Sequence, residues 1–361
     1  MSRDLPILAV TPGDPEGIGP EIVWKAIRKD IARKLGVRIL CVGARKPFER
    51  LKAPIDAMDA CDFSDPRKGT SNSRVWLYAA PDQPEKRGAH LGGYQSGWAI
   101  REATHMVKEG IAAAIVTGPI SKDHLQQGGF PYPGHTEFLA ALCATPETTA
   151  PKVTMMLANE QLRISLVTTH IALRDVPKAV TAEQIRRAVT HTVDSLHDWW
   201  GIRNPHIAVA ALNPHAGEAG LFGNEEQKTI EPALDKLRAE FGSTCKITGP
   251  LPADTLFANH ILAVQERTRA KRGPSSGRVA YDAVICMYHD QGLIPVKLLD
   301  FQKTVNVTLG LPIVRTSVDH GVAFDIAGAG IADPSSLESA LRLAAEIVLK
   351  KRRKKMGSKR P

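Results

Sequence analysis

Three histidines stand where apolar runs of the sequence end. His170 closes the run 162–170, His215 closes the run 206–215, and His289 lies in the polar end of the run 281–290. If these runs are strands of a parallel sheet, the three imidazoles meet at one edge of that sheet. Three nitrogen ligands with an open fourth position form a catalytic divalent-metal site, which polarises a substrate oxygen.

The same histidines have a plainer interpretation. A single histidine at a strand end is more often a hydrogen-bonded structural residue, and spacings of 45 and 74 residues match no local zinc motif. The metal hypothesis gains from two nearby carboxylates, Asp290 and Asp254, which we expect to orient the rings. The residue pattern alone leaves both interpretations open.

A second set of residues is suited to binding anions. His135 and Thr136 stand in "PYPGHTEFLA", where a helix start could bind a phosphate or carboxylate, or where Thr136 could simply cap a helix beginning at Glu137. Arg315 follows the apolar run "LGLPIV" and needs an anionic partner, either an internal carboxylate or a substrate phosphate. The segment 297–321 adds Lys297 and Asn306.

Two glycine-rich segments could bind nucleotides. "VTPGDPEGIGPEI" (10–22) is neither a G-x-G-x-x-G nor a Walker motif, so it is either a tight turn before a helix or a backbone cradle for an anion. "DHGVAFDIAGAGIADPSS" (319–336) is either a loop that ends at a helix cap at Ser335, or a nucleotide loop whose Asp325 accepts hydrogen bonds from ribose hydroxyls.

The elements that must position these residues alternate along the chain. Apolar runs predict strands and amphipathic segments predict helices, and this alternation indicates a mostly parallel α/β sheet. The expected strands are 5–10, 37–43, 112–118, 162–170, 206–215 and 281–290. The expected helices are 19–35, 93–110, 181–200 with Thr181 as N-cap, and 224–242.

Composition favours a globular cytoplasmic protein. The 361 residues suit two domains, 43% are hydrophobic, and no apolar run is long enough to span a membrane. The first residues lack the apolar core of a secretion signal. The five cysteines are odd in number, scattered and without a C-x-x-C pair, which favours neither a disulfide framework nor a zinc knuckle.

The positive charge lies in a tail. Residues 350–361 hold eight Lys or Arg and no acid, and removing these eight from the formal charge of +9 leaves +1. We therefore interpret the tail as a solvated, disordered end rather than an arm that binds nucleic acid.

The ordered motifs resemble the 4-hydroxythreonine-4-phosphate dehydrogenase family of pyridoxal phosphate (vitamin B6) biosynthesis, including its paralogues. The likeness runs from about residue 7 to residue 345. It rests on "TPGDPEGIGPEI", "VTGPISK", "GHTEFLA", "VTTHIALRDVP", "LNPHAGEAGLFGNEE", "GPLPADTLF", "MYHDQGL" and "VNVTLGLPIVRTSVDHGVAFDIAG". Residues 258–280 are longer than the family pattern leads us to expect, and the basic tail is extra.

The resemblance implies two α/β/α domains with mostly parallel sheets, like those of isocitrate and isopropylmalate dehydrogenases, and an active site in the interdomain cleft. We place the cofactor-side domain at 1–137 plus 303–349, the metal- and dimer-side domain at 138–302, and the disordered tail at 350–361. The family forms homodimers that share the metal site between subunits.

Family roles carry over to residues that match the motifs. The metal ligands fall on His170, His215 and His289; zinc is the expected ion, one per subunit, with magnesium or cobalt as alternatives. The other roles fall on His135, Thr136, Lys297, Asn306 and Arg315 for the substrate, on His320, Gly321 and Asp325 for NAD, and on Lys297, Asp290 and Asp254 for catalytic support.

The implied activity is NAD- and metal-dependent oxidation of 4-phosphohydroxy-L-threonine at C3, followed by decarboxylation to 3-amino-2-oxopropyl phosphate. Paralogues apply the same chemistry to D-threonate or D-erythronate 4-phosphate, or to a cyclic diol dicarboxylate. Phosphate acetyltransferases share the general architecture, but acyl transfer needs no histidine triad. We expect a small phosphorylated hydroxy acid as substrate, and neither nucleic acid nor membrane as partner.

Overall fold

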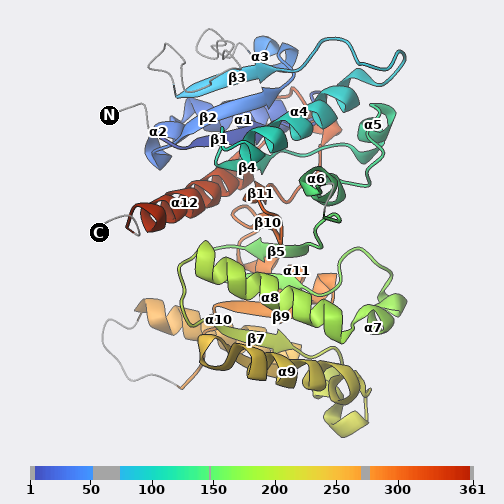
Figure 1. Cartoon of the computed structure of the whole chain (residues 1–361), viewed down its shortest axis with the longest axis vertical. Coiled ribbons are helices and arrows are strands. Elements are labelled where there is room, and N and C mark those ends of the chain that lie inside the picture. Colours follow the sequence, from blue (N-terminus) through green and yellow to red (C-terminus); the bar gives the residue numbers. More distant parts are fainter. Residues whose placement is uncertain (1–4, 52–73, 146–147, 270–276, 358–361) are drawn as a thin grey trace. The chain divides into compact units, whose positions relative to one another are not determined.

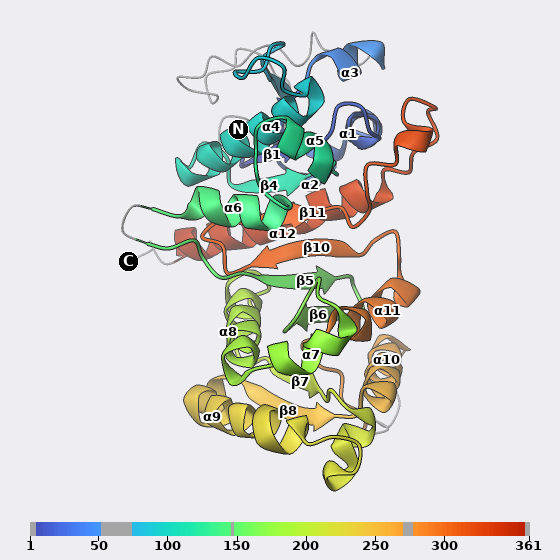
Figure 2. The same cartoon turned by 90° about the vertical axis from the view of Figure 1, so that its right-hand side faces the viewer.

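The chain divides into two compact units. The computed structural model describes residues 5–51, 74–145, 148–269 and 277–357 (Figures 1 and 2). The first unit comprises Met1–Val153 and Gly310–Pro361, and the second comprises Thr154–Leu309. The chain passes from one unit to the other after residues 153 and 309, which is further along than the sequence-based boundaries at 137/138 and 302/303. The reason is an antiparallel ladder that begins with the pair Thr154 and Leu309 and so keeps both of its strands in the second unit.

The first unit contains a parallel sheet that is buried on both faces. Its strand order is β3 (Val75–Ala79), β2 (Arg38–Gly43), β1 (Ile7–Thr11), β4 (Ala114–Thr117) and β11 (Arg315–Ser317). Successive residues of a strand point to opposite faces, yet every residue of β1 is buried. This explains why β1 reads as a continuous apolar run rather than as an alternating pattern.

Helices cover both faces of this sheet. Residues of α4 (Leu91–Lys108) and α6 (His135–Cys143) share a core with Ile7 and Ala9 of β1. On the other face, α12 (Ser335–Gly357) contacts β1, β4 and β11, and the Thr316 hydroxyl donates a hydrogen bond to the Ala340 carbonyl. The remaining helices of this unit are α1 (Gly19–Arg28), α2 (Ile31–Leu35), α3 (Lys46–Arg50) and α5 (Lys122–Gln127).

The second unit has a mixed sheet. Its order is β10 (Val305–Leu309), β5 (Thr154–Ala158), β6 (Arg163–Leu166), β9 (Ala283–Cys286), β7 (His206–Ala210) and β8 (Lys246–Leu251). The β10–β5 and β5–β6 pairs are antiparallel, and the β6–β9, β9–β7 and β7–β8 pairs are parallel.

Alternate residues of β7 separate the two cores of this unit. Ile207 and Val209 pack with α8 (Ala182–Asp198) and α9 (Glu231–Phe241). Ala208 and Ala210 pack with α10 (Ala253–Arg269) and α11 (His289–Leu299). Figure 2 shows these helix pairs on opposite sides of the sheet. Shorter helical turns are η3 (Leu173–Asp175), α7 (Val176–Ala179), η4 (Pro214–Gly220), η5 (Glu226–Ile230) and η6 (Gly242–Thr244).

The mostly parallel α/β class is thus confirmed, and Thr181 caps α8 by accepting a hydrogen bond from the Gln184 amide. Several element boundaries differ from the expectations. The helix expected at 19–35 is divided at Asp30, whose backbone is left-handed (φ 55°). The strand expected to reach residue 290 ends at Cys286, and α11 begins at His289. Gly134, not Thr136, precedes α6 as its N-cap.

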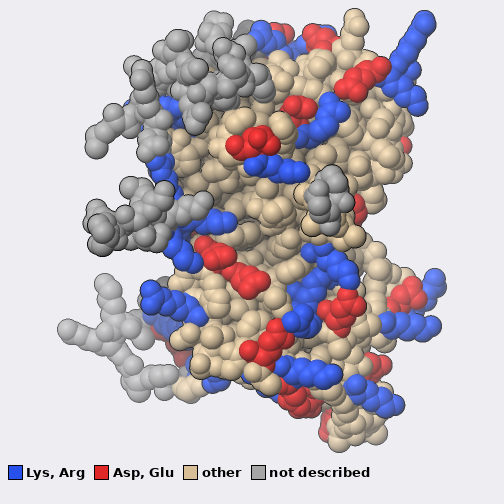
Figure 3. All heavy atoms as spheres, viewed as in Figure 1, with Lys and Arg blue, Asp and Glu red and all other residues tan. Residues whose placement is uncertain are grey.

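The basic end of the chain continues α12. Residues 350–357 are helical rather than disordered, because Lys and Arg are good helix formers and positive charge is favourable at a helix C-terminus. Residues 358–361 of the predicted tail lie outside the described residues. Of the long segment 258–280, residues 258–269 belong to α10, and 270–276 also lie outside the description. On the face shown in Figure 3, charges of both signs are interspersed.

None of the helices in the described ranges combines the length and the apolar character needed to cross a lipid bilayer.

Helices α4 and α5 approach so closely that one position must lack a side chain. A Cβ at Gly93 would lie 1.6 Å from the His124 carbonyl oxygen and 2.3 Å from its carbon, both backbone atoms that cannot move independently.

We therefore expect Gly93→Ala to force α4 and α5 apart and to lower the free energy of unfolding by about 1–3 kcal/mol, as overpacked cores do. Gly321→Ala is the matched control, because a Cβ there meets nothing within 4 Å. Urea unfolding of both variants measures the effect. Equal urea midpoints for the two variants would show that α4 and α5 can move apart at no cost in stability.

Candidate functional site

Two of the three predicted metal ligands lie side by side in the second unit. Their strands β6 and β9 are adjacent and parallel, and the Thr168 hydroxyl donates a 2.7 Å hydrogen bond to the Met287 carbonyl just beyond both strand ends. This bond holds the two following loops together. The rings of His170 and His289 consequently stand with centroids 5.4 Å apart.

His289 is oriented by its neighbour. Its Nδ1 lies 2.6 Å from Asp290 Oδ1, so the imidazole donates its Nδ1 proton to the carboxylate. That tautomer leaves a lone pair on Nε2. A histidine with one nitrogen bound to a carboxylate and the other open is typical of metal ligands.

His215 does not form a compact cluster with this pair. Within the described residues, the nitrogens of His170, His215 and His289 do not all lie within 4.8 Å of one another. His215 begins a run in which residues 215–219 all have positive φ, between 42° and 80°, and its ring contacts Phe222 instead. A left-handed run of this length with non-glycine residues is strained and persists only where surrounding contacts hold it.

Glu226 supplies those contacts. Its buried Oε1 accepts hydrogen bonds from the backbone amides of Leu212 and Asn213 at 2.8 Å each, and Oε2 accepts from the Asn213 side chain at 2.9 Å. These hydrogen bonds fix the backbone of Leu212 and Asn213, which precedes the strained run. The sequence analysis missed Glu226; an acid eleven residues after a strand-end histidine carries no clear signal.

Gln291 is one of four consecutive polar residues that interrupt the apolar stretch 284–299. Its side chain is buried, accepts from the Met287 amide at 2.7 Å and donates to the Ala211 carbonyl at 2.6 Å. It thus joins the ends of β9 and β7, the two strands that precede His289 and His215. A glutamine inside an apolar run is costly unless it is hydrogen-bonded, so the sequence marks this residue as used but does not identify its partners.

The other residues predicted for this unit have distinct positions. Lys297 lies half-buried on α11, with its Nζ 5.4 Å from the centre of the Phe301 ring, and Asn306 lies on β10 opposite Leu157. Asp254 is exposed in the first turn of α10 and has no hydrogen bond to His170, His215 or His289. Within one chain Asp290 orients His289, and the role of Asp254 stays a prediction.

The anion-binding candidates of the first unit come together. Arg315 is buried, and its Nε and Nη2 donate to the Thr117 hydroxyl at 3.1 and 2.8 Å. Burial lowers the pKa of Arg315 to about 9, which leaves the guanidinium positive at neutral pH. Burial, and secondarily the charge of Arg315, lowers the pKa of His135 well below its usual range, so His135 is neutral. Its Nε2 is buried without a hydrogen-bond partner among the described residues.

The glycine-rich segment 319–334 is tethered to α1. The Ile18 amide donates to the Val322 carbonyl at 2.9 Å, and the buried Glu21 carboxylate accepts from the amides of Gly330 and Ala332 at 3.3 and 2.9 Å. Lys25 adds hydrogen bonds to the carbonyls of the same two residues at 2.8 and 2.7 Å. The two glycine-containing motifs of the sequence are therefore one structural assembly.

The predicted cofactor residues lie on this tethered segment. His320 Nδ1 contacts the Gly321 carbonyl at 3.0 Å, and Asp325 is exposed within the 3-10 turn η7 (Phe324–Ile326). Gly321 has open space where a side chain would be. The segment thus presents backbone and the Asp325 carboxylate to solvent; its second exposed carboxylate, Asp333, accepts hydrogen bonds from Ser335.

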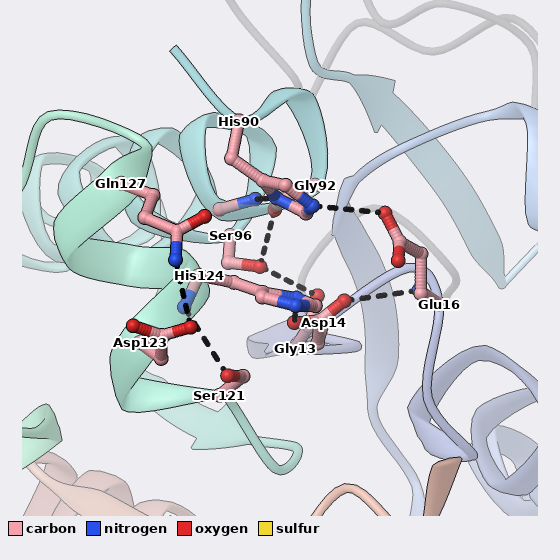
Figure 4. A network of polar contacts seen from close by, with 11 residues as sticks. Gly13, Asp14, Glu16, His90, Gly92, Ser96, Ser121, Asp123, His124 and Gln127 are labelled. Carbon is pink, nitrogen blue, oxygen red and sulfur yellow. Dashed lines mark hydrogen bonds and ion pairs between the residues drawn. The ribbon is translucent and has the colours of Figure 1, made fainter.

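A polar network lies nearby in the same unit (Figure 4). His124 Nδ1 donates to the fully buried Asp14 at 2.7 Å, and His90 Nε2 lies 3.5 Å from Glu16 Oε1. The two imidazoles stack with centroids 4.0 Å apart, and Phe324 stands 5.2 Å from the His124 ring. Neither His90 nor His124 was singled out from the sequence, because no local spacing joins them.

Comparison with known proteins supports the resemblance of the motifs. A 4-hydroxythreonine-4-phosphate dehydrogenase of Geobacter metallireducens is 42% identical over 96% of this chain and 97% of its own. The crystal structure of such an enzyme from Klebsiella pneumoniae covers 95% of this chain and 98% of its own, with 34% identity and a TM-score of 0.75.

Other relatives are named for different substrates. A Bradyrhizobium diazoefficiens protein assigned provisionally as a D-threonate 4-phosphate dehydrogenase is 40% identical over 94% of this chain and 96% of its own. A terephthalate 1,2-cis-dihydrodiol dehydrogenase structure from Burkholderia xenovorans is 28% identical over 94% of this chain and 98% of its own, with a TM-score of 0.61. A branched-chain phosphotransacylase from Enterococcus faecalis, 14% identical with a TM-score of 0.51, shares the fold alone.

The family described as "Pyridoxal phosphate biosynthetic protein PdxA" matches residues 38–344, and together with these full-length dehydrogenase relatives this match shows that the chain belongs to the PdxA family of dehydrogenases.

Proposed function

We propose that this protein is an NAD- and divalent-metal-dependent dehydrogenase that oxidises 4-phosphohydroxy-L-threonine at C3 and releases CO2, giving 3-amino-2-oxopropyl phosphate for pyridoxal phosphate biosynthesis. The observation that carries the proposal is the pair of adjacent imidazoles, His170 and His289, with Asp290 fixing the tautomer that exposes a lone pair. Few structural roles for a histidine need that arrangement at the ends of parallel strands.

The donor set of the second unit fits the proposed metal. His170, His289 and, from its strained turn, His215 would hold it, with zinc favoured by nitrogen ligands. Such an ion supplies Lewis-acid polarisation of a substrate hydroxyl. Because the three histidine nitrogens do not all lie within 4.8 Å of one another within one chain, joint coordination requires either a shift of these residues or the second subunit of a dimer.

Residues of the first unit support binding of the anionic substrate groups. The buried Arg315 guanidinium is positive at neutral pH and lies beside His135, so a phosphate or carboxylate that reaches this position would form charge-assisted hydrogen bonds with it. The neutral His135, whose buried Nε2 is unpartnered, would gain its missing hydrogen bond from the substrate. Thr136, beside it at the start of α6, would add a hydroxyl.

The tethered segment 319–334 is the proposed NAD contact. Glu21 and Lys25 of α1 hold its backbone, so the segment loses little conformational entropy when a cofactor binds. The exposed Asp325 carboxylate would accept hydrogen bonds from ribose hydroxyls and would repel the additional phosphate of NADP. His320 and Gly321 would contribute backbone access beside it.

The overall chemistry balances without a further reactant. The substrate loses a hydride from C3 to NAD⁺ and the proton of its hydroxyl to a base, which yields a β-keto acid. Breaking its bond to the carboxylate releases CO2, and the electron pair left on carbon takes up a proton. We assign Lys297 to neutralising charge or supplying that proton, and Asn306 to hydrogen bonding with the substrate.

Exposed apolar side chains support a homodimer. Ile294, Leu298 and Phe301 are exposed at helical spacing along and just beyond α11, with Leu298 82% exposed. Further exposed apolar residues follow the other two histidines: Ile171, Leu173, Leu221 and Phe222. A surface of this kind around three metal-ligand candidates is suited to a second copy of the chain.

The alternative keeps the mechanism and changes the substrate. Relatives of nearly equal identity are named for 4-hydroxythreonine 4-phosphate and, provisionally, for D-threonate 4-phosphate, and a more distant one is named for a cyclic diol. The residues described here recognise phosphate, carboxylate and hydroxyl groups, which the two phosphorylated substrates share.

Formation of NADH with each substrate, in the presence of zinc, magnesium or a chelator, tests the proposal. We expect chelator-sensitive turnover of 4-phosphohydroxy-L-threonine and little turnover of D-threonate or D-erythronate 4-phosphate. Turnover of only the latter two would select the alternative. Chelator-resistant oxidation would contradict the metal assignment.

Arg315→Lys should weaken substrate binding, since lysine keeps the charge but loses the planar fork that pairs with an anion. We expect KM for the phosphorylated substrate to rise about 10–100-fold, the range of a charge-assisted hydrogen bond, with a smaller effect on KM for NAD. Arg33→Lys is the control, because Arg33 is 75% exposed and pairs only with Asp30 at the surface. Unchanged substrate KM in Arg315→Lys would argue against the anion site.

Glu226→Gln should weaken metal binding while the chain remains folded, because an amide NH2 replaces one carboxylate oxygen. With the remaining oxygen kept on the two backbone amides, the new NH2 faces the Asn213 side-chain NH2, and that hydrogen bond is lost. We expect metal affinity to fall about 10–100-fold, as for other residues that orient ligands. Glu231→Gln, at an exposed position in the first turn of α9, is the matched control. Equal affinities in two folded variants would show that His215 does not depend on Glu226.

A further inference from the structure

We propose that Glu16, His90 and His124 form a second divalent-metal site, located in the first unit and separate from the histidines of the second unit. One ligand atom from each residue lies within 4.8 Å of the other two, and no other group of three or more in the described ranges meets that condition. Glu16 comes from the loop after β1, His90 precedes α4, and His124 lies on α5, so three separate elements converge (Figure 4).

Asp14 prepares His124 as a ligand. The Asp14 carboxylate is fully buried; Oδ2 accepts the His124 Nδ1 proton at 2.7 Å, and Oδ1 accepts the Glu16 amide at 3.0 Å. The lone pair of His124 is therefore on Nε2. One buried carboxylate thus orients the imidazole and also fixes the backbone of the second ligand, which is the arrangement that supports metal ligands elsewhere.

The charge of the network favours a cation. Asp14 and Glu16 bring two negative charges, and within the described ranges neither carboxylate pairs with a Lys or Arg; their ion-pair partners are His124 and His90. An imidazole must be neutral to bind a metal, and the two carboxylates then leave the cluster with a charge of −2. A divalent ion would balance this charge, and two imidazoles with one carboxylate are ligands suited to Zn²⁺ or Co²⁺ rather than to Mg²⁺ or Ca²⁺.

His90 must change its hydrogen bonding for the ion to bind. Its Nδ1 now accepts a 3.1 Å hydrogen bond from the Gly93 amide at the start of α4, which leaves the proton on Nε2, facing Glu16. Coordination through Nε2 requires the proton to be on Nδ1. Nδ1 can then no longer accept the hydrogen bond from the Gly93 amide, so the helix cap is lost. A single helix cap is weak compared with a metal–imidazole bond, so the exchange favours the bound ion. It also gives binding a local signature at Gly93.

The ion can reach the site from solvent. The Glu16 side chain is 55% exposed, and those of His90 and His124 are 27% and 20% exposed. Three protein ligands and an open side leave room for a water molecule or for a ligand atom.

The experiment uses the full-length chain, stripped of metal with EDTA and titrated with Co²⁺ while visible absorption and calorimetry count the bound ions. The His289→Gln background removes a ligand of the second unit, so Co²⁺ that remains bound reports on the first unit. We expect His289→Gln to retain one equivalent. Adding Glu16→Gln or His124→Gln should abolish it, and adding Asp14→Asn should lower its affinity about 10–100-fold.

His105→Gln is the matched control, since His105 is exposed on α4 outside the cluster. Glu16→Gln is expected to fold normally, because the Glu16 side chain is 55% exposed, so a loss of Co²⁺ binding in this variant reports on the ligand and not on misfolding. Amide exchange at Gly93 should become faster when Co²⁺ binds to His289→Gln. The proposal is overturned if His289→Gln binds no Co²⁺, or if the added substitutions at Glu16 and His124 leave its affinity unchanged.

Discussion

The buried side chain of Gln291 is the interaction on which the second unit depends. Parallel strands end with backbone groups that no longer have a ladder partner, and buried groups of this kind must find one. The Gln291 amide satisfies the Met287 amide and the Ala211 carbonyl at once. In doing so it fixes the ends of β9 and β7 relative to each other, and the loops that carry His289 and His215 start from that junction.

Carboxylates do the corresponding work in loops that no sheet supports. Glu226 binds the backbone before the strained run of residues 215–219, and Glu21 binds the glycine-rich segment at Gly330 and Ala332. Each is buried and each accepts backbone amides. A buried carboxylate with such donors is stable only in one geometry, because loss of a donor leaves a buried charge unpaired. The loops are therefore held in single conformations despite their glycines and unusual backbone angles.

The sequence predicted the α/β class and the cores of most strands because full burial writes a continuous apolar run, as in β1 and β9. It did not predict the residues at which those strands end. The strand expected to reach residue 290 stops at Cys286 because Gln291 must reach back to Met287. For the site, strand-end position placed His170 beside His289. The roles of Gln291, Glu226 and the pair His90–His124 depend on contacts between elements that are separate in sequence, which no local pattern contains.

The proposed binding groups differ in burial. Arg315 is almost fully buried, so its attraction for an anion is strengthened by a low local dielectric and is little screened by salt. His170 and His215 are exposed, and His289 is half-buried. Exposed imidazoles stay in contact with solvent, whereas a buried cation is stable only among polar partners. Neighbouring carboxylates order the histidine segments: Asp290 bonds to His289, and Glu226 fixes the backbone before His215.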